Sequence, residues 1–129
     1  MNRFTPYLLV SLGSLVGGNA RYILGRWIGG MIDARFPLAT FLINVGGSFI
    51  LGVVGGLVAQ KAVPHADAVR LALGVGFCGG FTTFSTFEFE THALLEDGIW
   101  LTAATNMLLS LFAGLVAVRL GLVAARAWF

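Results

Sequence analysis

The segment from Gly76 to Glu90 holds the residue types in this chain that are best suited to binding an ion. Two adjacent glycines, Gly79 and Gly80, are followed by two β-branched threonines, and this combination makes a poor helix interior. We therefore predict that a helix breaks here. Backbone carbonyl and N–H groups that are freed in an apolar surrounding must engage protein, water or an ion. The break is thus a candidate ion site.

Hydroxyl groups and aromatic rings are interleaved directly beyond the two glycines. Freed carbonyl oxygens suit an alkali cation, whereas hydroxyl groups can donate hydrogen bonds to an anion. Four hydroxyls follow one another here, those of Thr82, Thr83, Ser85 and Thr86. Phe84 and Phe87 are three residues apart and should project from one helical face, where the positive ring edges can coordinate a small anion weakly. Packing against neighbouring helices is the alternative for these rings, and the density of hydroxyls favours the ion path.

Two stripes of small and polar residues run at a spacing of four elsewhere in the chain. Residues at this spacing share one helical face, and both faces should meet protein or water, not lipid. Interhelical hydrogen bonds, worth about 0.6 kcal/mol each in membranes, explain the stripes as well as a polar track for a solute does. The stripes comprise Asn44, Ser48, Gly52 and Gly56, and Asn106, Ser110 and Gly114.

The composition places these residues in a membrane. Hydrophobic residues make up 57% of the chain and charged residues 11%, whereas soluble domains carry roughly 25% charged residues. We expect an all-α membrane protein in which residues 1–129 form a single four-helix transmembrane domain, with the third helix broken near the midplane. Four apolar stretches are each long enough to cross a hydrocarbon core about 30 Å thick, roughly Pro6 to Met31, Leu38 to Ala59, Val69 to Leu95 and Ile99 to Val123.

Glycines recur at four-residue intervals along these stretches. Such spacing lets helix backbones approach closely in lipid, where dispersion contacts and interhelical hydrogen bonds replace the hydrophobic effect. We expect a tightly packed and oligomeric bundle. The pairs are Gly13 with Gly17, Gly25 with Gly29, Gly52 with Gly56, and Gly76 with Gly80.

Other classes of function find little support in the sequence. The net charge is only +2 and the basic residues are scattered, so we expect no nucleic-acid partner. The single cysteine, Cys78, lies in an apolar stretch and indicates a packed thiol. The sequence suggests no set of nucleophile, base and orienting residue and no metal-ligand cluster, so we expect no enzyme.

The basic residues predict the orientation only weakly. If successive loops face opposite sides, Arg26 and Arg35 lie on one side, and the other side holds Arg3, Lys61, Arg70 and Arg126. The positive-inside rule then leans toward cytoplasmic termini. A chain with so mild a bias can insert in both orientations.

The residues Gly-Gly-Phe-Thr-Thr-Phe-Ser-Thr-Phe at positions 79–87 resemble the signature of the Fluc (CrcB) family of fluoride channels. Residues 17–22 (Gly-Gly-Asn-Ala-Arg-Tyr), residues 44–49 (Asn-Val-Gly-Gly-Ser-Phe) and Ser110 are similar to further family positions. The resemblance covers nearly the whole chain. It implies passive fluoride efflux across the bacterial cytoplasmic (inner) membrane, which lowers the toxic fluoride that enters as HF and is trapped as the anion.

The resemblance also implies an assembly and a bound ion. Family members are antiparallel homodimers of dual topology, with two fluoride pores along the subunit interface. A structural Na⁺ lies at the dimer centre, held by backbone carbonyls of the broken helix. Carried over to this chain, those carbonyls belong to Gly79 and Thr82.

The family's pore residues map onto this chain one by one. The paired phenylalanines correspond to Phe84 and Phe87, and the pore asparagine, whose amide can donate to fluoride, corresponds to Asn44. Arg21 matches an arginine near a vestibule, with pairing to a backbone carbonyl as an equal alternative, and Glu90 matches an acidic position beyond the phenylalanines. The line of donors is represented by Thr83, Ser85, Thr86 and Ser110.

Two positions depart from the family pattern. Asn106 stands where members often carry a pore-facing tyrosine, and it remains a hydrogen-bond donor in the expected fluoride path. Glu88 stands where a serine is common, and because an ionised carboxylate would repel an anion, we expect it to face the vestibule or a basic partner.

A proton-coupled exporter of the small multidrug type is the rival interpretation, since it also has four helices and dual topology. Such an exporter needs a membrane-embedded carboxylate as its coupling group. The first apolar stretch holds no acidic residue, which favours the channel. A purely structural subunit would explain the glycines but not the cluster of hydroxyls and rings.

Overall fold

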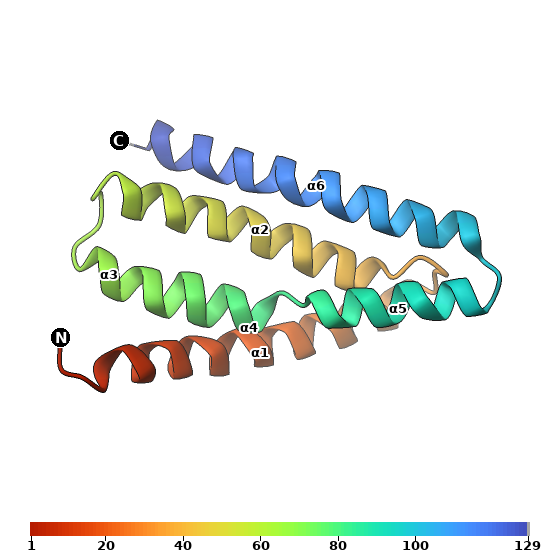
Figure 1. Ribbon diagram of the computed structural model, residues 1–129, viewed down its shortest axis with the longest axis horizontal. Helices are drawn as coiled ribbons and strands as arrows, with labels where there is room; N and C mark the ends of the chain where they lie inside the picture. The colour runs from red at the N-terminus through yellow and green to blue at the C-terminus, as the bar shows by residue number, and fades with distance from the viewer. Residues whose placement is uncertain (129) are drawn as a thin grey trace.

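The computed structural model describes residues 1–128 and consists of long helices that lie side by side (Figure 1). Both termini and the turn between α2 and α3 lie at one end of the molecule (Figure 1). No strand occurs within residues 1–128. The helices are α1 (Thr5–Met31), α2 (Leu38–Ala59), α3 (Ala66–Val69), η1 (Arg70–Cys78), α4 (Gly79–Phe81), α5 (Phe84–Glu96) and α6 (Trp100–Ala127).

The all-helical fold predicted from the sequence is confirmed, and the apolar stretches coincide with these helices. Within residues 1–128 three segments are long and apolar enough to cross a membrane: Leu38–Ala59, Ala66–Glu96 and Trp100–Ala127. Helix α1 has sufficient length at 27 residues. It falls outside this group because it is less apolar, with Asn19, Arg21 and Arg26 in its second half.

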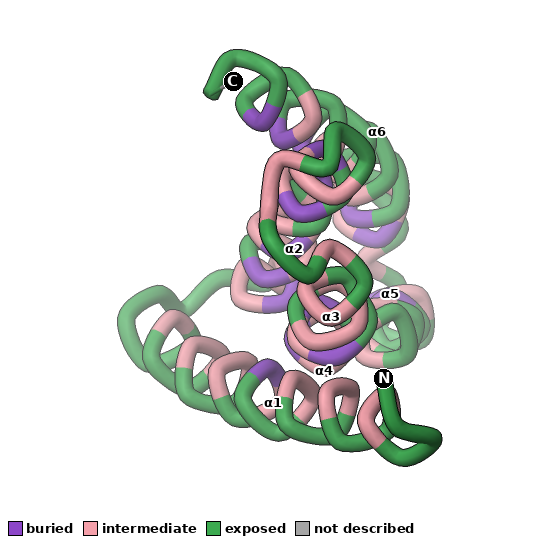
Figure 2. Tube along the Cα trace, turned by 90° about the vertical axis from the view of Figure 1, so that its left-hand side faces the viewer, coloured by how far each residue is buried: buried purple, intermediate pink, exposed green. Residues whose placement is uncertain are grey.

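The exposed surface of the chain is apolar, and its buried core is small. Figure 2 shows burial concentrated where α2, α4, α5 and α6 face one another, while the outer faces are exposed. Leu101 is 82% exposed and Tyr7 is 72% exposed, whereas Cys78 is 2% exposed. Outer faces of this kind suit lipid or another protein subunit better than water.

Glycines bring two pairs of helices into backbone contact. A Cβ atom added at Gly17 of α1 would lie 2.2 Å from the carbonyl oxygen of Phe77 in η1. A Cβ atom added at Gly121 of α6 would lie 2.2 Å from the carbonyl oxygen of Phe49 in α2. The predicted close packing is therefore present at these crossings. Gly29, expected to act in the same way, has no such neighbour within the described residues.

The third membrane segment contains a feature that the sequence analysis did not predict. Residues Arg70–Cys78 form a π-helix, the wider winding with i→i+5 hydrogen bonds. This stretch packs against α1 and leads directly into the short helix α4. A π-helical stretch is uncommon and frequently lies at a functional site. The residues that follow it are therefore candidates for such a site.

Candidate ion pathway

The helix predicted to break does so between α4 and α5. Thr82 has φ −80° and ψ 159°, and Thr83 has φ −151° and ψ 112°, so both residues are extended. Figure 1 shows the resulting gap between the two helices. The two glycines themselves remain helical in α4, and the extended residues are the two β-branched threonines that follow Phe81.

The side chain of Asn44, on α2, binds the backbone of this break from both sides. Its Oδ1 accepts a hydrogen bond of 2.7 Å from the Thr83 N–H, and its Nδ2 donates one of 3.0 Å to the Thr83 carbonyl. In a continuous α-helix the Thr83 N–H would instead bond to the Gly79 carbonyl four residues earlier. The Asn44 amide therefore takes the place of a helical partner and releases the Gly79 carbonyl.

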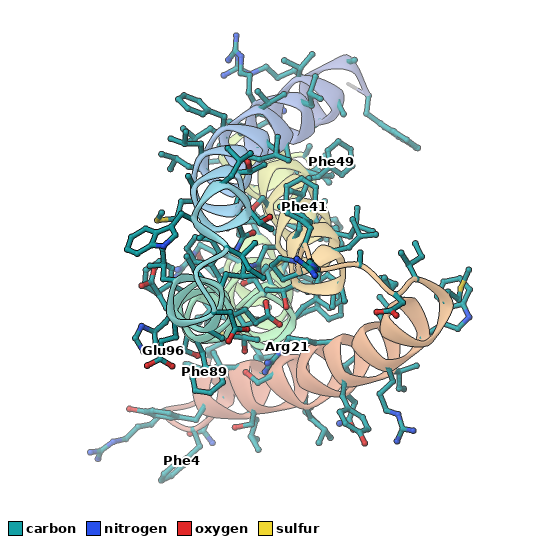
Figure 3. The ribbon with its side chains drawn as sticks, turned by 90° about the vertical axis from the view of Figure 1, so that its right-hand side faces the viewer. Phe4, Arg21, Phe41, Phe49, Phe89 and Glu96 are labelled. Carbon is teal, nitrogen blue, oxygen red and sulfur yellow. The ribbon has the colours of Figure 1, made fainter. Side chains whose placement is uncertain are left out.

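Arg21 contributes a further bond to this region from α1. Its Nε donates to the Gly80 carbonyl at 3.0 Å, and Figure 3 shows the side chain pointing from α1 toward the broken helix. The carbonyl pairing considered as an alternative for this arginine is thus what the structure contains. The positive charge of this guanidinium group also stabilises the partial negative charge of the freed carbonyls.

The threonine hydroxyls around the break are largely engaged with the protein. Thr82 Oγ1 donates to the Cys78 carbonyl at 2.7 Å. Thr83 caps α5, because its Oγ1 accepts from the Thr86 N–H at 3.2 Å and donates to Thr86 Oγ1 at 2.9 Å. Within the described residues no acceptor is found for the Thr86 hydroxyl proton, and Thr86 lines neither of the two hollows that adjoin the break.

Two hollows adjoin the break and share Asn44 and Phe84. The first has a volume of about 380 Å³ and contains Gly79, Thr82 and Thr83 in its wall. Both residues expected to offer carbonyls to a cation therefore border the same space. Oxygen ligands of this kind suit a hard cation.

The second hollow brings together four of the residues expected in the anion path. It has a volume of about 350 Å³, and the Phe84 and Phe87 ring centroids lie 5.9 Å apart at an interplanar angle of 42°. Phe84 is 75% exposed, so this wall is open at the surface of the chain. The lining residues are Asn44, Phe84, Phe87, Met107, Ser110 and Leu111.

Met107 and Leu111 were missed in the sequence analysis, although a signal for them exists. Met107 lies three residues before Ser110 and four residues before Leu111 on α6, at the spacings that put helical residues on one face. An apolar residue in an apolar helix gives no other sign of facing a pathway.

Asn106 does not line this hollow. Its side chain is 1% exposed, donates from Nδ2 to Thr91 Oγ1 at 2.9 Å, and accepts at Oδ1 from Ser110 Oγ at 3.2 Å. Thr91 in turn donates to the Phe87 carbonyl at 2.7 Å. Asn106 thus connects α6 to α5 through Thr91 and accepts the hydrogen bond that orients the Ser110 hydroxyl.

Glu90 lies away from the break, at a third hollow of about 220 Å³ that also includes Asp33. Thr40 Oγ1 donates to its Oε1 at 2.9 Å, and its Oε2 is buried without a partner among the described residues. Ser85 and Glu88 are exposed and line none of these hollows. Arg21 is not among the residues that line the hollow at Glu90.

Taken together, these features define a multi-pass helical membrane protein with an interrupted helix beside small, mostly apolar hollows. The family model of the CrcB-like proteins, described as Camphor Resistance (CrcB), matches residues 8–122. A "Fluoride-specific ion channel FluC" of Solibacter usitatus is 44% identical over 120 residues, which cover 93% of this chain and 98% of that protein. A protein of the same name from Prosthecochloris aestuarii is 40% identical over 98% of this chain and 97% of its own length. The chain belongs to the CrcB family.

Proposed function

We propose that this protein is a fluoride-selective channel through which fluoride leaves the cytoplasm down its electrochemical gradient. Relatives that match nearly the whole chain carry the name of a fluoride-specific ion channel. The observation that carries the proposal is the hollow in which Asn44, Phe84, Phe87 and Ser110 meet. It is a channel and not an enzyme, and the cytoplasmic (inner) membrane of a bacterium is its proposed location.

The chemistry of this hollow suits a small anion that must pass and not be trapped. One Asn44 amide hydrogen bonds to the Thr83 carbonyl, so the second hydrogen is left to donate to fluoride. The positive edges of Phe84 and Phe87 add weak attraction. The hydroxyl of Thr86, which lies between these two residues in the sequence, is a further proposed donor. Fixed donors in a space of low dielectric replace part of the water that the ion loses.

The working unit is proposed to be an antiparallel homodimer in which each copy crosses the membrane four times. Helix α1 is the fourth span, long enough at 27 residues and packed on η1 and α4. The open wall at Phe84, which is 75% exposed, is where the second copy would complete the path. Dual insertion is supported by the mild asymmetry of Lys and Arg between the two ends.

A Na⁺ ion is proposed to lie between the two copies, held by the carbonyls of Gly79 and Thr82. The donor set fits, because the Asn44 amide removes the helical partner of the Gly79 carbonyl and both residues border one hollow. Two carbonyls from one chain leave a hard cation with few oxygen ligands. A second copy would double the number, and the ion would then fix the geometry of the break.

Reconstitution into liposomes tests the proposed function. Vesicles loaded with potassium fluoride or potassium chloride, with valinomycin present to carry K⁺, should release fluoride and retain chloride. The release should proceed without a pH gradient. Equal release of both anions, or fluoride release only when protons flow the other way, would contradict a passive fluoride channel and support an exporter.

A further inference from the structure

A methionine sulfur lies among the residues proposed to carry fluoride. Met107 is three residues before Ser110 on α6 and lines the hollow of about 350 Å³ with Asn44, Phe84 and Phe87. Its side chain is 41% exposed. A thioether at this place meets whatever moves through the hollow, including small oxidants dissolved in water.

We propose that Met107 is a redox-modification site within the fluoride path, and that its oxidation by a peroxide reduces fluoride conduction. The inference rests on the proposed channel function. In this step the Met107 sulfur attacks one peroxide oxygen, an S–O bond forms and the O–O bond breaks. The sulfur is oxidised by two electrons to the sulfoxide, and with hydrogen peroxide the second oxygen takes up the proton of the attacked oxygen and leaves as water.

The donors in the hollow are few, and this makes the path sensitive to a new acceptor. Ser110 Oγ donates to Asn106 Oδ1 at 3.2 Å, and one Asn44 amide hydrogen is held by the Thr83 carbonyl at 3.0 Å. The second Asn44 hydrogen is therefore the main donor left for fluoride. A sulfoxide oxygen carries partial negative charge and accepts hydrogen bonds, so it competes for that donor and repels the anion.

The other sulfur atoms of the chain serve as internal controls. Met31 is 64% exposed and ends α1, away from the hollow, and Met1 is 74% exposed near the other end of the same helix. Cys78 is 2% exposed. Oxidation of Met1 or Met31 is therefore expected without any effect on fluoride.

The test compares fluoride efflux from liposomes before and after treatment with hydrogen peroxide, and again after the two methionine sulfoxide reductases. The wild-type protein should lose about fivefold in rate, as expected for one competing hydrogen-bond acceptor, and recover after reduction. Met31→Leu should behave as the wild type does. Met107→Leu should conduct fluoride at the same rate before and after peroxide treatment. Met107→Gln carries a polar acceptor permanently, so its fluoride efflux should be slow even without peroxide.

Peptide mass spectrometry of the same wild-type samples shows which sulfur has gained an oxygen atom. Loss of flux in Met107→Leu equal to that of the wild type would overturn the proposal, because the target would then lie elsewhere. So would oxidation of Met107 with unchanged flux, oxidation of Met31 alone, or full flux in Met107→Gln. Absence of fluoride flux before any peroxide is added would instead contradict the proposed function itself.

Discussion

At the scale of single residues, the Asn44 amide both binds the backbone of the break and lines the hollows beside it. Its two hydrogen bonds to Thr83 hold the broken helix open, with lengths of 2.7 and 3.0 Å. The same amide borders both hollows at the break. One side chain therefore couples the backbone geometry that frees a carbonyl to the donor that we propose for the anion.

Replacement of Asn44 by aspartate should stop fluoride flux. The carboxylate still accepts from the Thr83 N–H, but it can donate neither to the Thr83 carbonyl nor to fluoride, and its charge repels the anion. We expect a rate at least about tenfold lower, in line with the loss of a hydrogen bond to a charged group, with size-exclusion behaviour unchanged. Liposome efflux measures the rate.

Gln60→Glu is the matched control for this change. Gln60 is an exposed amide that bonds to the Gly56 carbonyl at the end of α2, remote from the hollows. It should conduct as the wild type does. A comparable loss of fluoride efflux in both variants would show that a new carboxylate is harmful at either position. The proposal that Asn44 lines the fluoride path would then be wrong.

The residue types of the site could be predicted from the sequence, but their partners could not. Asn44, Phe84, Phe87 and Ser110 stand out because polar and aromatic groups are unusual in an apolar chain, and the structure brings them together. Asn106 stands out for the same reason, yet its hydrogen bonds turn it into the joint between α5 and α6. A polar side chain in a membrane helix indicates that it has a hydrogen-bond partner, but the sequence does not show which residue that partner is.

At the scale of the elements, the break depends on α1 as well as on its own residues. Helix α1 packs on η1 and α4, and at Gly17 the two backbones are too close for a side chain. Arg21, one turn further along α1, then reaches the Gly80 carbonyl. Close packing of α1 thus positions the guanidinium group of Arg21 beside the break.

Gly17→Ala should destabilise the protein, whereas Gly18→Ala should not. The added Cβ at Gly17 would lie 2.2 Å from the Phe77 carbonyl oxygen, while a Cβ added at Gly18 would meet no atom within 4 Å. Overpacking of this kind costs about 1–3 kcal/mol, and alanine at Gly18 gains up to about 1 kcal/mol in helix propensity. Thermal unfolding in detergent compares the two variants, and equal melting temperatures would contradict the close contact.

Helix positions were predictable to within a few residues, because long apolar runs bounded by Pro, Gly and charges define them. The expected second helix, Leu38–Ala59, has the same bounds in the structure. The π-helix at Arg70–Cys78 was not predicted, because an apolar stretch indicates a helix without showing which hydrogen-bond spacing the helix adopts.

At the scale of the whole molecule, the basic residues are only mildly biased toward one end. The end that holds both termini and the α2–α3 turn (Figure 1) carries Arg3, Lys61, Arg70 and Arg126, and the other end carries Arg26 and Arg35. Because the positive-inside rule acts through such differences, a small difference allows insertion both ways. An antiparallel pair would then place unlike ends together on each membrane face.

Labelling of a cysteine at the terminal end of the bundle tests dual insertion. Ala127 is exposed at the end of α6 and carries no charge, and the native Cys78 is 2% exposed. In intact cells a membrane-impermeant maleimide should label about half of the Ala127→Cys protein, as expected for balanced topology. Complete labelling, or none until the membrane is opened, would show a single orientation and rule out the antiparallel dimer.

Fluoride is proposed to pass beside the Phe84 ring, and single-channel recording in planar bilayers measures the current that such a passage carries. Phe84 and Phe89 both lie on α5 and are 75% and 76% exposed, but only Phe84 lines the hollow with Asn44. Phe84→Ile removes the positive ring edge with little change in volume, so it should abolish the fluoride current, while Phe89→Ile should conduct as the wild type does. An undiminished fluoride current in Phe84→Ile would contradict the account.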